Sequence, residues 1–192
     1  TNASLPTLAL DFDTVYAPLG VAFDGAGNLW VSQFSGRLAR FDAPLTTDSK
    51  PAATLSTGDN ANLYDVVVNP ALNTVYSAGL KGIVAFVAPK DGDKPSFTMQ
   101  PSTRYNALGL RADGSIFATE FASDTVVSFH PPLSAASQRV PRTTEGAGWG
   151  IRFQQDGTVL RTGLGGSAFE QSAAPKAMDL FSASSLVIDK NP

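Results

Sequence analysis

The repeat on which this chain is built reads Pro18-Leu19-Gly20-Val21-Ala22-Phe23-Asp24 and continues with Gly27-Asn28-Leu29-Trp30-Val31-Ser32. Three further copies follow, in which the position of Phe23 is taken by Val68, Leu110 and Phe153. The spacings between these four positions are 45, 42 and 43 residues. A period of this length, with several short strands in each unit, is typical of propeller blades. The repeat therefore predicts an all-β fold, a β-propeller of four blades with four antiparallel strands in each.

The composition fits one folded domain. Of 192 residues 43% are hydrophobic and 16% are charged, which favours a packed core over disorder. The net charge of -3 and the scattered Lys and Arg residues argue against a nucleic-acid partner. No apolar run approaches the roughly 18 residues of a membrane-spanning helix, and the lack of cysteine excludes disulfides and zinc-thiolate sites. We expect a mature bacterial chain without a signal peptide, secreted or periplasmic.

Each unit shows the same order of strands, which places the repeats at about 19–60, 61–104, 105–146 and 147–192 within a single domain. An apolar first strand is followed by a Gly/Asn/Asp/Pro turn and a second strand, the chemistry of a β-hairpin. The third strand is expected to end on a recurring phenylalanine, and the fourth is polar, as suits an outer edge. The recurring phenylalanines are Phe41, Phe86, Phe129 and Phe181.

The two ends of the chain bear on closure of the ring. Residues 5–14 have the pattern of an outer strand with no other strands of a blade before them, and the last unit ends in a short tail. We expect the N-terminal strand to complete the last blade and join the ends, so that no strand edge stays open. The alternative is an incomplete ring whose edges pair with a second copy, so both a monomer and a homodimer are open.

The first copy, together with Phe41-Asp42, resembles an NHL repeat and is similar to the blades of streptogramin-lyase-like and gluconolactonase-like propellers. These families include lyases, lactonases, peptide-processing enzymes and interaction modules, so the resemblance implies a fold before it implies an activity. The lyases use paired histidines with a glutamate, whereas this chain has the single His130, expected in a loop on the face opposite the site. The lactonases hold a divalent metal with a glutamate that enters an early first strand, where this chain has Leu19-Gly20.

In a propeller, the connections that enter each first strand and leave each second strand meet at one mouth of the central channel, where a ligand would bind. An aromatic residue stands near the start of every first strand, and the second strands lead into Phe34, Lys81 and Phe121. The segment Gly163 to Lys176 is predicted to be a long loop over this mouth. Our candidate ligand-binding residues are Tyr64, Asp65, Tyr105, Asn106, Glu120 and Trp149. They would bind a small polar or sugar-like ligand. Alternatively, their side chains would fill a narrow central channel and pack between adjacent blades.

The sequence thus favours a binding module for a small polar ligand or a protein partner, with no catalytic residues and no cofactor. One alternative is a metal-dependent lactonase- or lyase-like enzyme with Asp65, Asn106 and Glu120 around a divalent cation such as calcium. Another is a partial propeller that completes itself by homo-oligomerisation.

Overall fold

The protein folds into consecutive antiparallel β-sheets of four strands each. The computed structural model describes residues 10, 17–121, 123, 125–142, 148–153, 159–163, 167–171 and 176–179. The first sheet comprises β1 (Pro18–Phe23), β2 (Leu29–Gln33), β3 (Arg37–Phe41) and β4 (Ala53–Ser56). The second comprises β5 (Leu63–Asn69), β6 (Thr74–Gly79), β7 (Gly82–Val87) and β8 (Phe97–Met99), with the 3-10 turn η1 (Pro70–Leu72) between β5 and β6.

The same order continues in the second half of the described chain. The third sheet comprises β9 (Tyr105–Leu110), β10 (Ile116–Glu120), β11 (Val126–Phe129) and β12 (Val140–Arg142). The fourth comprises β13 (Gly148–Phe153), β14 (Val159–Gly163), β15 (Ser167–Gln171) and β16 (Lys176–Asp179). The described part of the chain contains no helix with the length and hydropathy that crossing a bilayer requires.

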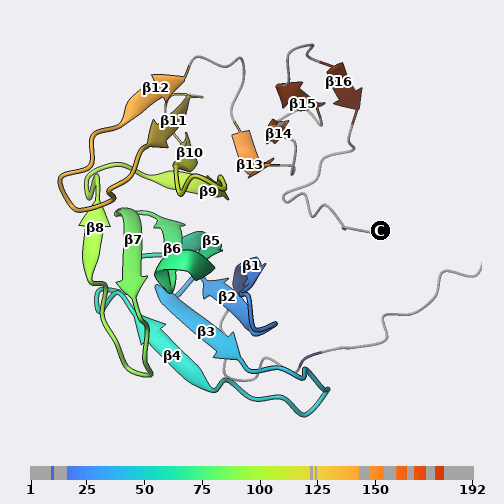
Figure 1. Ribbon diagram of the computed structural model, residues 1–192, viewed down its shortest axis with the longest axis vertical. Coiled ribbons are helices and arrows are strands. Elements are labelled where there is room, and N and C mark those ends of the chain that lie inside the picture. Colours follow the sequence, from blue (N-terminus) through green and yellow to red (C-terminus); the bar gives the residue numbers. More distant parts are fainter. Residues whose placement is uncertain are drawn as a thin grey trace, which may run out of the picture.

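The sheets follow one another around a common centre, as Figure 1 shows. The first strands lie inside, where β1 contacts β5, β5 contacts β9 and β9 contacts β13. The strands β4, β8, β12 and β16 lie outside. This is the arrangement that the repeat predicts, because each unit can bury its apolar faces only against its neighbours.

Strand pairing shows that the four units are equivalent residue by residue. Trp30, Tyr76, Phe117 and Leu160 occupy the same register position, since they pair with Ala22, Val67, Gly109 and Arg152 respectively. The sequence alignment of the first two strands of each unit is therefore confirmed.

The core lies between the sheets. Trp30, Leu38 and Leu55 of the first sheet pack with Val66 and Phe86 of the second. The second sheet packs on the third through a larger cluster whose buried members are Val67, Tyr76, Ala78, Ile83, Ala85, Met99, Tyr105, Leu108, Ile116, Ala118, Val127 and Phe129. Every large side chain in these clusters removes apolar surface from water, at about 25 cal/mol for each Å² buried.

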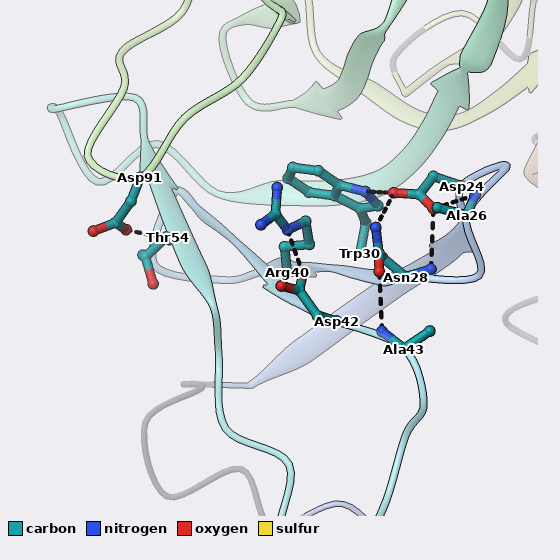
Figure 2. A network of polar contacts seen from close by, with 9 residues as sticks. All are labelled: Asp24, Ala26, Asn28, Trp30, Arg40, Asp42, Ala43, Thr54 and Asp91. Atoms are coloured by element: carbon teal, nitrogen blue, oxygen red, sulfur yellow. Dashed lines mark hydrogen bonds and ion pairs between the residues drawn. The ribbon is translucent and has the colours of Figure 1, made fainter.

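The turn between β1 and β2 is held by one carboxylate (Figure 2). Asp24 accepts hydrogen bonds from the amides of Ala26 and Asn28, at 2.9 and 3.0 Å, and from the Trp30 indole at 3.1 Å. Burial alone would raise the pKa of Asp24, but the hydrogen bonds from Asn28 and Trp30 lower it below its ordinary value. The turn aspartate thus also fixes the orientation of a core tryptophan.

The free edge of the first sheet is covered by a loop of the second. The amide of Thr54 on β4 donates to the Asp91 carboxylate at 2.8 Å, and the Thr54 carbonyl accepts from Gly92 at 2.9 Å. The Ser56 amide donates to the Asp93 carbonyl at 3.1 Å. Backbone groups that an edge strand would leave open are therefore paired within the molecule.

Two predictions for the fourth unit are wrong. The segment Gly163 to Lys176 is not a long loop, because it contains β15 (Ser167–Gln171) and reaches the start of β16. Gln171, which pairs with Val159 as Phe41 pairs with Leu29, occupies the position predicted for Phe181. Small and polar residues predominate in β15, so its composition gives only a weak signal for a strand. Phe181 lies outside the described residues.

Closure by the N-terminal strand is also wrong. The fourth sheet takes its outer strand from Lys176–Asp179, so the position intended for residues 5–14 is already filled. Leu10, the one described residue of that segment, packs instead on the cluster of Leu29, Val31, Ala39 and Phe41 in the first sheet. Among the described residues no strand of the first sheet pairs with the fourth, so the sheets do not form a closed ring.

Candidate binding surface at the channel mouth

One hydrogen bond recurs at the same end of the first three sheets. The amide of the residue that follows each second strand donates to the carbonyl of the residue that precedes each first strand. The pairs are Phe34 to Ala17 at 3.1 Å, Leu80 to Asn62 at 3.0 Å and Phe121 to Arg104 at 3.0 Å. This bond brings the two kinds of connection together at one mouth of the channel, as the sequence analysis expected.

The donors of these bonds carry exposed apolar side chains. Phe34, Leu80 and Phe121 are 46%, 44% and 43% exposed, and we call these three residues the mouth rim. Leu164 holds the same position in the fourth unit, after Gly163, but lies outside the described residues. Exposed apolar residues scattered singly need no explanation, whereas a set repeated at equivalent positions does.

A second repeated feature is a β-bulge near the start of each inner strand. The pairing of β1 with β2 skips Leu19, and the corresponding extra residues are Tyr64, Asn106 and Trp149. A bulge re-aims the side chain of the extra residue. Three of the six candidate site residues, Tyr64, Asn106 and Trp149, therefore occupy equivalent backbone positions. Trp149 is placed here by its strand, β13.

Arg104 connects the rim to the bulges. Its guanidinium lies 3.5 Å from the ring centroid of Phe121 and 4.6 Å from that of Tyr64, a cation–π arrangement with two rings. The Tyr64 hydroxyl accepts a weak hydrogen bond from the Asn62 side chain at 3.5 Å. No ion pair of Arg104 is found within the described residues. The structure thus places a cation between aromatic rings of two neighbouring sheets.

Asp65 acts between the sheets. Its buried carboxylate accepts the Leu108 amide of β9 at 2.8 Å and the Val66 amide at 2.9 Å. On its other side β1 approaches so closely that a Cβ on Gly20 would lie 2.7 Å from the Asp65 Cα. Position 20 therefore requires glycine, and Asp65 lies where three inner strands approach one another.

Glu120 and Tyr105 are direct partners across β9 and β10. Glu120 is buried, forms an ion pair with Arg139 at 2.5 Å and accepts a hydrogen bond from the Ser123 hydroxyl. Burial, followed by the negative charge of Glu120, raises the pKa of Tyr105 to about 12. The phenol is therefore neutral near neutral pH.

Asn106 differs from Asp65 and Glu120, whose carboxylates have hydrogen-bond partners. Its side chain is 7% exposed, and its Oδ1 atom is buried without a hydrogen-bond partner among the described residues. Buried polar atoms nearly always have a partner. The Tyr105 hydroxyl is likewise buried without a partner there, so two adjacent candidate residues, Tyr105 and Asn106, each have a buried polar atom that forms no hydrogen bond.

Two cavities lie beside these residues. One of about 280 Å³ follows the inner strands and is lined by Val21, Ala22, Val66, Val67, Val68, Gly109 and Leu110. The other, of about 160 Å³, is lined by the connection from β4 to β5 and by the second sheet, with Asp59 and Lys81 among its lining. None of the five candidate residues whose side chains the structure describes, namely Tyr64, Asp65, Tyr105, Asn106 and Glu120, lines either cavity. Tyr64 instead lies against Arg104 at the mouth, and Asp65 forms a hydrogen bond between neighbouring sheets.

Arg104 and Leu80 were not predicted as site residues. Arg104 directly precedes the predicted Tyr105, and Leu80 precedes the predicted Lys81. The repeat of Phe, Leu, Phe and Leu after the four second strands was the available signal. His130 lies at the opposite end, as predicted, where its two ring nitrogens contact the hydroxyls of Ser115 and Ser128 at 3.2 and 3.1 Å.

The acidic groups show no metal-binding arrangement in the part of the chain that the structure describes. No three His, Asp or Glu side chains there gather closely enough to hold an ion. Of the two carboxylates proposed for such a site, Asp65 accepts backbone amides and Glu120 pairs with Arg139.

Comparison with known proteins shows the fold. No protein-family model matches the chain, and no curated protein matches it. Among solved structures it is similar to the β-propeller domain of Cps50 (Swd1) from Myceliophteria thermophila, with 14% identity and a TM-score of 0.55. The match covers 80% of this chain and 50% of that one, so the chain spans about half the length of that domain. The protein therefore has a fold of the β-propeller type.

Proposed function

We propose that the protein is a binding module, built of NHL-type blades, that holds a protein segment on its mouth rim. One observation carries the proposal: Phe34, Leu80 and Phe121 are exposed to nearly the same extent at equivalent positions of three sheets. Apolar groups of this size gain most when a partner removes them from water. Their backbone is fixed by the recurring hydrogen bond, so little order has to be gained on binding.

Arg104 indicates the chemistry of the partner. Its guanidinium lies against Phe121 and Tyr64, which limits its motion, and it has no ion pair within the described residues. A preorganised guanidinium favours a carboxylate with paired hydrogen bonds. The partner is therefore a segment that carries apolar side chains next to Asp, Glu or a C-terminal carboxylate.

A small polar ligand is the second candidate, and the buried, unpartnered Oδ1 of Asn106 favours it. Such a ligand would donate a hydrogen bond to Asn106 and lie against Tyr64 and Trp149, with Asp65, Tyr105 and Glu120 behind it. Nothing comparable favours the metal-dependent enzyme, because Asp65 and Glu120 would first have to release their present partners. Export from a bacterial cell stays a prediction.

A random peptide library displayed on phage tests the proposal. Peptides enriched on the native chain are synthesised, and their dissociation constants are measured by fluorescence anisotropy. We expect Phe34→Ser and Phe121→Ser each to weaken binding by about tenfold, as the loss of a buried Phe implies. Arg104→Gln should weaken the acidic peptides more than their Asn and Gln analogues.

The matched control is Phe23→Ser, which removes an exposed phenylalanine of β1 outside the mouth rim. Peptides that bind the rim variants as tightly as the native chain would contradict the proposal. Loss of binding in Asn106→Ala but not in the rim variants would favour the small-ligand site.

A further inference from the structure

A cavity lies beside Leu80, the mouth-rim residue of the second sheet. Gly79 and Lys81, the neighbours of Leu80 in the chain, both line this cavity of about 160 Å³. Asn62 lines it too, and its carbonyl accepts the Leu80 amide at 3.0 Å. The cavity and the mouth rim therefore share the turn from β6 to β7, so a segment that contacts Leu80 lies next to the cavity.

The cavity combines apolar walls with a charged border. Three of its lining residues, Ala61, Leu63 and Val84, are buried and apolar. Two others, Asp59 and Lys81, form an exposed ion pair at 2.8 Å. Small-molecule and side-chain pockets typically have this composition, mostly apolar with a few polar groups that fix orientation. An apolar cavity of about 150 Å³ holds a group of the size of benzene.

The walls of the cavity are fixed before anything binds. A Cβ on Gly79 would lie 2.6 Å from the Asn62 carbonyl oxygen, so the two backbones are in close contact and position 79 requires glycine. Asp59 holds the connection from β4 to β5, because it accepts the Ala61 amide at 3.1 Å and the Lys81 ammonium at 2.8 Å. A preformed pocket loses little conformational entropy when it is filled.

We infer that this cavity holds one apolar side chain, of leucine to phenylalanine size, from the segment that the mouth rim binds. The inference rests on the proposed function and adds the position that selects the segment. Asn62 donates to the Tyr64 hydroxyl at 3.5 Å, and the Tyr64 ring centroid lies 4.6 Å from the Arg104 guanidinium. This line of contacts joins the cavity to the cation, so one segment fills the cavity and pairs its carboxylate with Arg104. An anchor in a buried pocket carries much of the binding energy of such interfaces.

Capped amino acids test the cavity separately from the rim. N-acetyl-leucinamide is added to the native chain while nuclear magnetic resonance follows the methyl groups of Ala61, Leu63 and Val84. We expect these resonances to shift until the site is saturated. N-acetyl-glycinamide, which lacks the side chain, should leave them unchanged. Unchanged resonances with the leucine probe, or equal shifts with the two probes, would overturn the inference.

Thr98 offers a variant that fills the cavity, because it pairs with Val84 across β7 and β8 and both residues line the cavity. We expect Thr98→Phe to abolish the shifts and to weaken the enriched peptides at least about tenfold. The matched control Thr98→Val keeps the shape of the side chain and should change neither. Undiminished peptide affinity in Thr98→Phe would overturn the inference.

Nuclear Overhauser contacts on the native chain cover the case in which Thr98→Phe does not fold. An apolar side chain of an enriched peptide should contact the Val84 methyl groups, and a bound peptide without such contacts would overturn the inference.

The variant Phe34→Ser separates this inference from the proposed function. It should weaken the peptides but leave the shifts caused by the leucine probe as they are, because Phe34 belongs to another sheet and does not line the cavity. Peptides that depend on Phe34 but not on the cavity would overturn the inference and leave the proposed function standing. Probe shifts that persist while no peptide depends on the rim would support the cavity and contradict the proposed function.

Discussion

Asp65 shows how a residue that suggests a ligand site can instead hold sheets together. A carboxylate beside an aromatic residue at a channel mouth has the chemistry of ligand recognition, and this much can be read from the sequence. Its real partners, the amides of Val66 and Leu108, depend on how closely β5 approaches β9. Asp65 and Leu108 are 43 positions apart in the sequence, so their contact depends on the tertiary fold and cannot be predicted from a local pattern.

Removing this carboxylate should therefore reduce stability. Asp65→Ala leaves two buried amides without acceptors, and we expect a loss of about 1–3 kcal/mol in the free energy of unfolding. Urea denaturation measures it. The control Asp42→Ala removes an exposed partner of Arg40 and should cost less than about 1 kcal/mol. Equal losses in the two variants would mean that Asp65 does not join the sheets.

The buried phenol of Tyr105 predicts an alkaline limit to stability. Its pKa is raised to about 12 in the folded protein by burial and by Glu120, against an ordinary 10.0. A group with a raised folded-state pKa contributes stability that is fully present below its unfolded value and is lost as pH rises. We expect the free energy of unfolding to fall between about pH 10 and 12.

The difference between the native chain and Tyr105→Phe isolates this contribution. The variant should show a shallower fall over the same pH window, and the absorbance of the tyrosinate should lack the component that appears last. A Tyr105 that ionises at the ordinary value would show that the phenol is in contact with water.

At the scale of single elements, the hairpins could be predicted best. The first two strands of each unit follow from alternation and turn residues, and the register confirms them in four sheets. The third strand of the fourth unit was missed, because Ser167–Gln171 contains small and polar residues and follows a Gly-rich segment. Its pairing with β14 and β16 defines it as a strand, although its composition does not indicate one.

The turn of the first hairpin offers a test at this scale. Asp24→Ala leaves the Trp30 indole and the Ala26 and Asn28 amides without their acceptor, and we expect a loss of about 1–3 kcal/mol, seen as a lower melting temperature. Asp113→Ala is the matched control, because that turn aspartate accepts the Ser115 amide and no tryptophan. It should cost less. Because hydrogen bonds lower the pKa of Asp24, this stabilisation should also weaken as pH falls below about 3.8.

At the scale of the whole molecule, the sequence predicts repetition but not closure. The period near 43 residues predicts that equivalent units pack against one another. The contacts of β1 with β5, of β5 with β9 and of β9 with β13 confirm this. Whether the ends meet depends on which strand completes the last sheet, and both residues 5–14 and Lys176–Asp179 have suitable patterns. Pairing with β15 selects Lys176–Asp179.

The mouth rim collects equivalent residues from three sheets at the strand ends. It arises from the arrangement of the inner strands around one centre (Figure 1). The account therefore depends on the order in which the sheets pack.

Nuclear Overhauser contacts between methyl and aromatic groups measure that order directly. We predict contacts between the set Trp30, Leu38 and Leu55 and the set Val66, Val75 and Val84, and between Tyr76, Ile83 and Met99 and Leu108, Ile116 and Phe129. Contacts from Trp30 directly to the third-sheet set, or none between the sets of neighbouring sheets, would contradict the account.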